Sequence, residues 1–113
     1  MNAKKSYLSA VISIRNEETQ LADCLETLSF ADEIVVLLDD CTDGSRDIAA
    51  GFTNRLIDGN WDVEGDRRNA GIEACHGDCI FEIDADERVP AALAAEIRAT
   101  IATTNSDWHG IRV

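Results

Sequence analysis

Two aspartates, Asp84 and Asp86, stand two positions apart directly after an apolar run that ends at Ile83. On an extended segment, residues two apart point to the same side, with their alpha carbons ~6.7 Å apart. At about 5 Å and an effective dielectric constant of about 20, two carboxylates repel each other by about 3 kcal/mol. In a cleft, a hard divalent cation relieves this repulsion and can bridge a carboxylate to a diphosphate. The pattern leaves one alternative open, a solvated acidic turn ahead of a helix.

Two further polar clusters follow apolar runs in the same way. Arg15-Asn16-Glu17 comes after Leu8–Ile14, and Asp39-Asp40 comes after Ile34–Leu38. Ligands gather at the carboxyl ends of parallel strands, because loops and helix N-termini converge there. Asp39 is therefore a candidate acceptor for hydrogen bonds from a nucleobase or ribose, or else it opens a turn.

Arg67 and Arg68 are the only adjacent arginines in the chain. A planar guanidinium group suits the recognition of paired oxygens, so one of the two is a candidate contact to a phosphate or a base. The alternative is a surface helix on which both arginines offset Asp66 and Glu64. Trp61 has a similar choice between stacking on a ligand and covering the edge of a sheet.

The segments that must position these residues alternate short apolar runs with helical periodicity, which is typical of a mostly parallel sheet covered by helices. We expect strands over Leu8–Ile14, Ile34–Leu38, Arg55–Ile57, Cys79–Ile83 and Trp108–Val113. The first predicted helix is capped by Asn16, and its buried face contains Leu21, Cys24, Leu25 and Leu28. The second predicted helix is capped by Thr42 and ends near Gly51, and the third spans Asp66–His76 with Gly77 as its C-terminal stop. The fourth begins at Pro90 and has Leu93, Ile97 and Ile101 on one face.

The composition bounds the class of protein. The chain has 113 residues, 10 of them basic and 22 acidic, for a net charge of −12, which argues against a nucleic-acid partner. An apolar fraction of 45% can fill a core, and the length fits a single domain over residues 1–113. No apolar run approaches the ~20 residues of a membrane helix, and the first apolar segment is typical of a strand and not of a signal peptide. We therefore expect a soluble, cytoplasmic domain.

The four cysteines are Cys24, Cys41, Cys75 and Cys79. They are scattered through apolar segments, and none of their spacings matches a zinc knuckle. We expect buried free thiols, with a metal or disulfide role as the alternative.

Taken together, several segments resemble family-2 glycosyltransferases of the GT-A fold, which carry a sugar from a nucleotide diphosphate to an acceptor. The matching stretches are Leu8 to Glu18, Ala31 to Asp39, Thr42-Asp43-Gly44-Ser45, Arg68-Asn69-Ala70-Gly71-Ile72, and Gly77-Asp78 through Asp84-Ala85-Asp86-Glu87-Arg88-Val89. They occur in the family's order and cover almost the entire chain. The Ala31–Ile34 start and the Asp84–Val89 ending are most similar to the lipopolysaccharide-core glucosyltransferase branch.

The resemblance implies a three-layer α/β/α sandwich with a mostly parallel sheet, the Rossmann-like nucleotide-binding half of the GT-A fold. It implies that Asp39 contacts the base, that Asp84 contacts the ribose or the metal, and that Asp86 binds Mg²⁺ or Mn²⁺ on the diphosphate. Arg68 would lie near the base or phosphates. The nucleotide pocket would be lined by residues Ser13 to Asn16, which include Ile14 and Arg15.

The resemblance also implies partners. The donor is a nucleotide-diphosphate sugar, with a UDP-sugar favoured. The acceptor is a cell-envelope polysaccharide or lipopolysaccharide, which places the chain in the cytoplasm at the inner face of the membrane. No integral membrane segment is expected.

The family continues well beyond its metal motif, and that region normally carries the acceptor site and the catalytic base. An inverting transfer needs such a base. Glu96 and Asp107 do not suit this role, because Glu96 falls in a predicted helix and Asp107 at the start of a predicted strand. We therefore expect the chain to be the donor-binding half of such an enzyme, and we assign no catalytic residue. A chain cut inside its sheet is expected to leave an open edge for a homodimer or a partner chain to cover.

Three other classes remain as alternatives. A catalytically inactive GT-A-like module would keep the fold and bind another protein. A receiver-type phosphoacceptor domain needs a lysine at the end of a late strand, but the only lysines are Lys4 and Lys5. A nucleotidylyltransferase needs a Gly-rich loop after the first strand, where Arg15-Asn16-Glu17-Glu18 stands instead.

Overall fold

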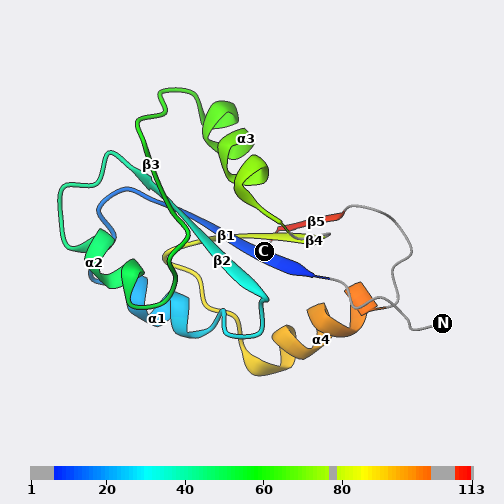
Figure 1. Ribbon diagram of the computed structural model, residues 1–113. Coiled ribbons are helices and arrows are strands. Elements are labelled where there is room, and N and C mark those ends of the chain that lie inside the picture. The colour runs from blue at the N-terminus through cyan, green and yellow to red at the C-terminus, as the bar shows by residue number, and fades with distance from the viewer. Residues whose placement is uncertain (1–6, 77–78, 103–108, 113) are drawn as a thin grey trace.

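The computed structural model describes residues 7–76 and 79–102, together with the backbone of residues 109–112. Strands and helices alternate along the whole of this part of the chain (Figure 1). In order they are β1 Leu8–Ile14, α1 Leu21–Glu26, β2 Glu33–Asp39, α2 Ser45–Ala50, β3 Leu56–Gly59, α3 Glu64–Ala74, β4 Cys79–Asp84, α4 Ala91–Ala102 and β5 His109–Arg112.

The five strands form one sheet in the order β3-β2-β1-β4-β5, and every neighbouring pair is parallel. β1 is the middle strand, and its register pairs Ile14 with Leu38 of β2 and Ser13 with Asp84 of β4. Because all strands run the same way, the carboxyl ends of β1, β2 and β4 meet at one edge of the sheet. We call this edge the C-terminal edge.

The two faces of the sheet are covered by different helices, and the alternation of side chains along each strand fixes which residues face which layer. Leu8, Ala10, Ile12 and Ile14 of β1 pack in a core with residues of α1, α2 and α4. Val11 packs on the opposite face with Val35, Leu37 and Ile80, beside Ile72 of α3. The expected three-layer α/β/α sandwich is therefore confirmed (Figure 1).

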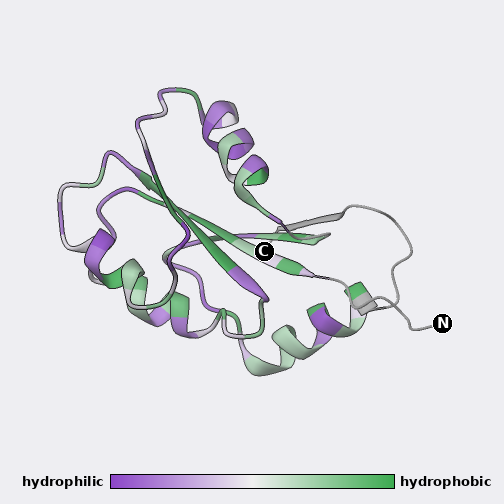
Figure 2. Ribbon diagram, viewed as in Figure 1, coloured by the Kyte–Doolittle hydropathy of each residue, from purple (hydrophilic) through white to green (hydrophobic). Residues whose placement is uncertain are grey.

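The hydropathy of the elements matches their positions. β1 and β2 are mainly hydrophobic along their length, whereas α3 is largely hydrophilic (Figure 2). The side chains of Val35, Val36, Leu37 and Leu38 are all buried, which confirms that β2 is covered on both sides. In α3, by contrast, Gly71 is the only buried residue.

The first helix begins later than the sequence predicted. Asn16 does not cap it: its φ of 56° is left-handed, and its Oδ1 accepts hydrogen bonds from the Thr42 and Asp43 amides at 2.7 and 3.2 Å. α1 starts only at Leu21, after a turn closed by Glu17. The predicted buried face is confirmed, because Leu21, Cys24, Leu25 and Leu28 are all buried.

Thr42 does not cap the second helix either. Gly44 occupies the N-cap position of α2, and the Oδ1 of Asp43 accepts the Ser45 amide hydrogen at 3.0 Å. Gly51 is the C-cap residue, as expected.

α3 begins at Glu64, two residues before the expected start, and ends at Ala74. Its C-cap residue Cys75 has extended backbone angles, and the expected stop at Gly77 lies outside the described residues.

The last helix and the strands follow the prediction closely. The Pro90 carbonyl accepts the Ala94 amide at 2.9 Å, and Ile97 and Ile101 are buried on one face of α4. β3 is displaced by one residue and extended to Gly59, while Trp108 and Val113 lie outside the described part of the last strand.

All four cysteines are free, as predicted. Cys24 and Cys79 are buried, whereas Cys41 and Cys75 are only half-buried, so the expectation of burial is wrong for those two. Within the described residues, no helix has both the length and the apolar character needed to cross a bilayer.

Candidate functional site

Three polar groups that the sequence singled out converge at the C-terminal edge. Arg15 follows β1, Asp39 ends β2 and Asp84 ends β4, and these three strands are neighbours. Asp39 and Asp84 continue the alternation that places Leu37 and Ile80 on the face covered by α3. The expected meeting of these clusters at one edge is therefore confirmed.

Asp39 is the most enclosed polar residue of the site, with only 1% of its surface exposed. Its Oδ1 accepts hydrogen bonds from Arg15 Nη2 at 3.2 Å and from the Trp61 amide at 3.1 Å. Its Oδ2 accepts one from Arg67 Nη1 at 3.3 Å. Burial acts to raise the pKa of this carboxyl, but the Trp61 amide and the guanidinium groups together hold the pKa below its ordinary value of 3.8. Asp39 is therefore a buried, ionised carboxylate with both oxygens engaged.

Two pockets open along this edge, and they share Glu64 and Arg67 of α3. The first lies between α3 and the sheet and reaches the end of β4. It is lined by Val11, Ser13, Leu37, Glu64, Arg67, Arg68, Ile72, Ile80, Glu82, Ile83 and Asp84. The second lies over the end of β2 and is lined by Arg15, Asp39, Trp61, Asp62, Glu64 and Arg67. Arg67 therefore borders both pockets.

Three carboxylates cluster just after β4. Asp84, Asp86 and Glu87 each place an oxygen within 4.8 Å of the other two. The Glu87 carboxylate also accepts the Asp84 amide hydrogen at 2.9 Å, which holds the turn that carries the cluster. These are hard oxygen donors of the kind that Mg²⁺ and Mn²⁺ prefer, so the donor set fits such an ion. Asp84 and Asp86 were predicted from their spacing, whereas Glu87, the next residue along the chain, was not.

The other predicted pocket residues have different surroundings. The Ile14 side chain is buried in the core on the face opposite α3, and the Ile14 carbonyl accepts a hydrogen bond from Cys41 Sγ at 3.4 Å. The Asn16 side chain bonds the loop after β2 and does not contact Asp39. Of the pocket residues Ile14, Arg15 and Asn16, only Arg15 directs its side chain to Asp39.

The two adjacent arginines diverge. Arg67 contacts Asp39, whereas Arg68 Nε lies 3.5 Å from Glu82 Oε2 in the pocket that reaches Asp84. The resemblance selected Arg68, and the structure adds Arg67 as the arginine that joins α3 to the end of β2.

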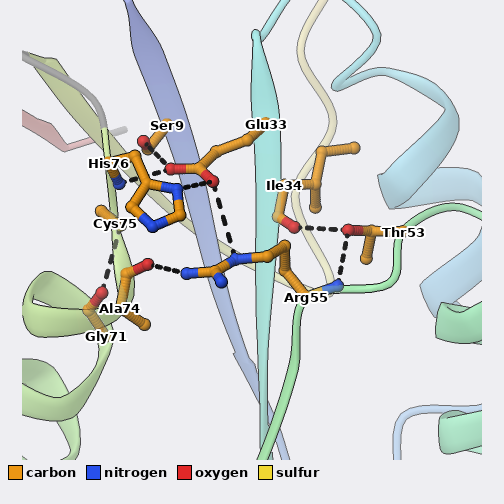
Figure 3. A network of polar contacts seen from close by, with 9 residues as sticks. All are labelled: Ser9, Glu33, Ile34, Thr53, Arg55, Gly71, Ala74, Cys75 and His76. Atoms are coloured by element: carbon orange, nitrogen blue, oxygen red, sulfur yellow. Dashed lines mark hydrogen bonds and ion pairs between the residues drawn. The ribbon is translucent and has the colours of Figure 1, made fainter.

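A second polar network holds α3 in place at the opposite end of the sheet. Glu33, at the start of β2, lies between Arg55, Ser9 and the C-terminal end of α3 (Figure 3). Its carboxylate accepts the His76 amide at 2.6 Å and lies 3.4 Å from His76 Nδ1 and 3.7 Å from Arg55 Nε. Arg55 in turn donates to the Ala74 carbonyl. The network ties the end of α3 to β2, and so it helps to set where the helix presents its arginines.

Comparison with known proteins shows the family to which the chain belongs. Residues 9–107 match the family model for glycosyl transferase family 2. The chain is 32% identical over 114 residues to the lipopolysaccharide core biosynthesis glycosyltransferase LpsC of Rhizobium meliloti, and it is 28% identical over 103 residues to an uncharacterised glycosyltransferase of Rickettsia conorii. These alignments take in 96% and 90% of the chain.

The fold has a solved counterpart as well. A crystal structure of residues 1–349 of S. aureus TarS superimposes with a TM-score of 0.69 over 84% of the chain, at 21% identity. The chain spans 42% of LpsC, 36% of the Rickettsia protein and 32% of the TarS chain. Because the family match extends over most of its residues, this chain belongs to glycosyl transferase family 2.

Proposed function

We propose that this chain binds a nucleotide-diphosphate sugar, with a UDP-sugar favoured, at the C-terminal edge of its sheet. In this proposal residues 1–113 form one nucleotide-sugar-binding domain that serves the transfer of a glycosyl group to an acceptor. The observation that carries it is the acidic cluster of Asp84, Asp86 and Glu87 at the end of β4, in which Asp84 lines the first of two pockets that share Arg67. In a member of this family, that placement favours a donor site.

The proposed roles follow from the positions of the residues. Asp84 and Asp86, with Glu87 beside them, would hold Mg²⁺ or Mn²⁺. Such an ion, when bound, neutralises charge on the diphosphate as the bond to the sugar breaks. Asp39 would accept a hydrogen bond from the base, and Arg15 and Arg68 would border the nucleotide from either side.

The acceptor belongs to the proposal and not to the observed site. LpsC is named for lipopolysaccharide core biosynthesis, and by that likeness we propose a cell-envelope polysaccharide or lipopolysaccharide acceptor. The same likeness favours a cytoplasmic location at the inner face of the membrane. A homodimer or a partner chain beside the edge strand β5 also stays a prediction.

Titration calorimetry with UDP, GDP and ADP, each with and without Mn²⁺, tests the donor site. We expect Mn²⁺-dependent binding of one nucleotide that disappears in Asp86→Ala. Glu96→Ala is the matched control, because Glu96 is an exposed carboxylate on α4, away from the edge. If the folded chain binds none of the three nucleotides, the proposal is wrong and a catalytically inactive interaction module becomes the better description.

A further inference from the structure

The carboxylate that the proposed function assigns to the base already accepts three hydrogen bonds from protein donors and is almost completely covered. Both oxygens of Asp39 accept hydrogen bonds, and its side chain is 2% exposed. Because so little of this side chain is exposed, a ligand N–H group can reach Asp39 only where one of the groups that cover it moves away. The Trp61 amide belongs to the backbone, so the candidates to move are the side chains of Arg15 and Arg67.

Arg67 is the better placed of the two. Its side chain is 29% exposed, and it borders both the pocket over β2 and the pocket that reaches Asp84. Arg15 borders only the pocket over β2 and is 56% exposed. A rotation of Arg67 can thus carry its guanidinium group from Asp39 toward the acidic end of the site without leaving the cavity wall.

The charges decide when this movement is favourable. Asp39 is one buried carboxylate between two guanidinium groups, and Glu64 is 3.9 Å from Arg67 on the solvent side. A guanidinium group that leaves Asp39 loses a charge-assisted hydrogen bond, and in a partly buried position it needs a new anion to compensate. A diphosphate supplies that anion, whereas an uncharged nucleoside does not.

We infer that Arg67 exchanges Asp39 for the diphosphate as its partner when the donor nucleotide binds, and this inference rests on the proposed function. In the exchange, the base donates its ring N–H to Asp39, and the displaced Arg67 turns to the diphosphate. Arg67 thereby makes recognition of the base conditional on the phosphates. A free nucleoside is disfavoured, because it would displace Arg67 from Asp39 and leave it only the exposed carboxylate of Glu64, a weak partner in solvent.

The inference makes two predictions of opposite sign for Arg67→Gln. Uridine should bind about tenfold more tightly to the variant, because the charge-assisted contact that it must displace is gone. UDP with Mn²⁺ should bind about tenfold more weakly, because its diphosphate loses a guanidinium partner. The dissociation constant of uridine divided by that of UDP with Mn²⁺ should therefore fall by about a hundredfold in the variant.

The experiment titrates wild type and Arg67→Gln with uridine by ligand-observed NMR and with UDP plus Mn²⁺ by calorimetry. Arg46→Gln is the control, because Arg46 is a half-exposed arginine of α2 that pairs with Asp58. It should leave both affinities unchanged, and urea unfolding of each variant reports its stability.

The outcomes separate the two claims. If wild type binds UDP but Arg67→Gln weakens or leaves unchanged the binding of uridine, the exchange is wrong and Arg67 is only a nucleotide contact or a structural residue. If wild type binds none of UDP, GDP and ADP in the presence of Mn²⁺, the proposed function is wrong, and the exchange that rests on it is wrong as well.

Discussion

Gly71 marks the closest approach of α3 to the sheet. A Cβ at this position would lie 3.0 Å from Leu37 Cδ1 and 3.0 Å from Val11 Cγ1, and both of those side chains are buried. Gly65 lies in the first turn of the same helix, and a Cβ there would meet no described atom within 4 Å apart from those of its chain neighbours and the adjoining helix backbone. The two glycines therefore give a matched pair, in which one substitution meets the core and the other meets solvent.

The expected magnitudes follow from two opposing effects. Replacing glycine by alanine inside a helix stabilises it by up to about 1 kcal/mol. Inserting a methyl group into a packed core costs about 1–3 kcal/mol. We expect Gly71→Ala to lower the free energy of unfolding by about 1 kcal/mol and Gly65→Ala to raise it by about 0.5 kcal/mol.

Urea unfolding followed by circular dichroism measures both variants against wild type. In a thermal melt, Gly71→Ala should shift the midpoint down by roughly 4 °C. A Gly71→Ala variant as stable as Gly65→Ala would refute the close seating of α3, and with it the basis for placing Arg67 at Asp39.

Three further predictions concern polar groups in the interior. Asp39→Asn should destabilise the protein most above about pH 4 and progressively less below it, because a carboxyl with a lowered pKa contributes stability that is lost as the pH falls through its folded pKa. Urea unfolding midpoints of wild type and variant at about pH 6 and about pH 3 measure this change. An equal difference between the two proteins at both pH values would contradict it. Glu33→Gln should lower the free energy of unfolding by about 2 kcal/mol, since the buried Arg55 Nε loses its charged neighbour, and denaturant unfolding measures the loss. Burial raises the pKa of the Cys24 and Cys75 thiols to about 11, so both should resist alkylation near neutral pH until the chain is unfolded, as read by mass spectrometry; rapid labelling of the folded chain would count against this.

The strands were the most predictable part of the fold. The run Leu8–Ile14 is both the first strand in sequence and the middle strand of the sheet, and layers on both faces bury every residue of it except the half-buried Ser13. A long apolar run predicts a buried strand without reference to the rest of the chain, so the hydrophobic periodicity and the length of these segments were sufficient to find the strands.

The helix starts were less predictable, because capping depends on which partner a polar side chain finds. Asn16 has the residue type of a cap, but its side chain bonds Thr42 and Asp43, residues 26 and 27 positions away. Those bonds hold Asn16 in a left-handed conformation that starts no helix. A local sequence pattern cannot predict a hydrogen-bond partner that is distant along the chain and comes close only when the sheet has folded.

The site was predictable to the level of the edge but not of every side chain. The ends of β1, β2 and β4 located it, since parallel strands end together. Which of Arg67 and Arg68 contacts Asp39 could not be predicted from the sequence, because neighbouring side chains on a helix point about 100° apart. The turn of α3 directs one toward Asp39 and the other toward Glu82.

The unequal cover of the two faces of the sheet has a consequence for how the molecule unfolds on warming. Three helices shield one side of the sheet, whereas α3, with a single buried residue, is the one described helix on the other. Partial opening of that thin layer needs far less free energy than melting of the whole domain. Amide hydrogen exchange should therefore be fastest among the helices in α3, and the proposed donor site should lose its shape while the strands are still intact.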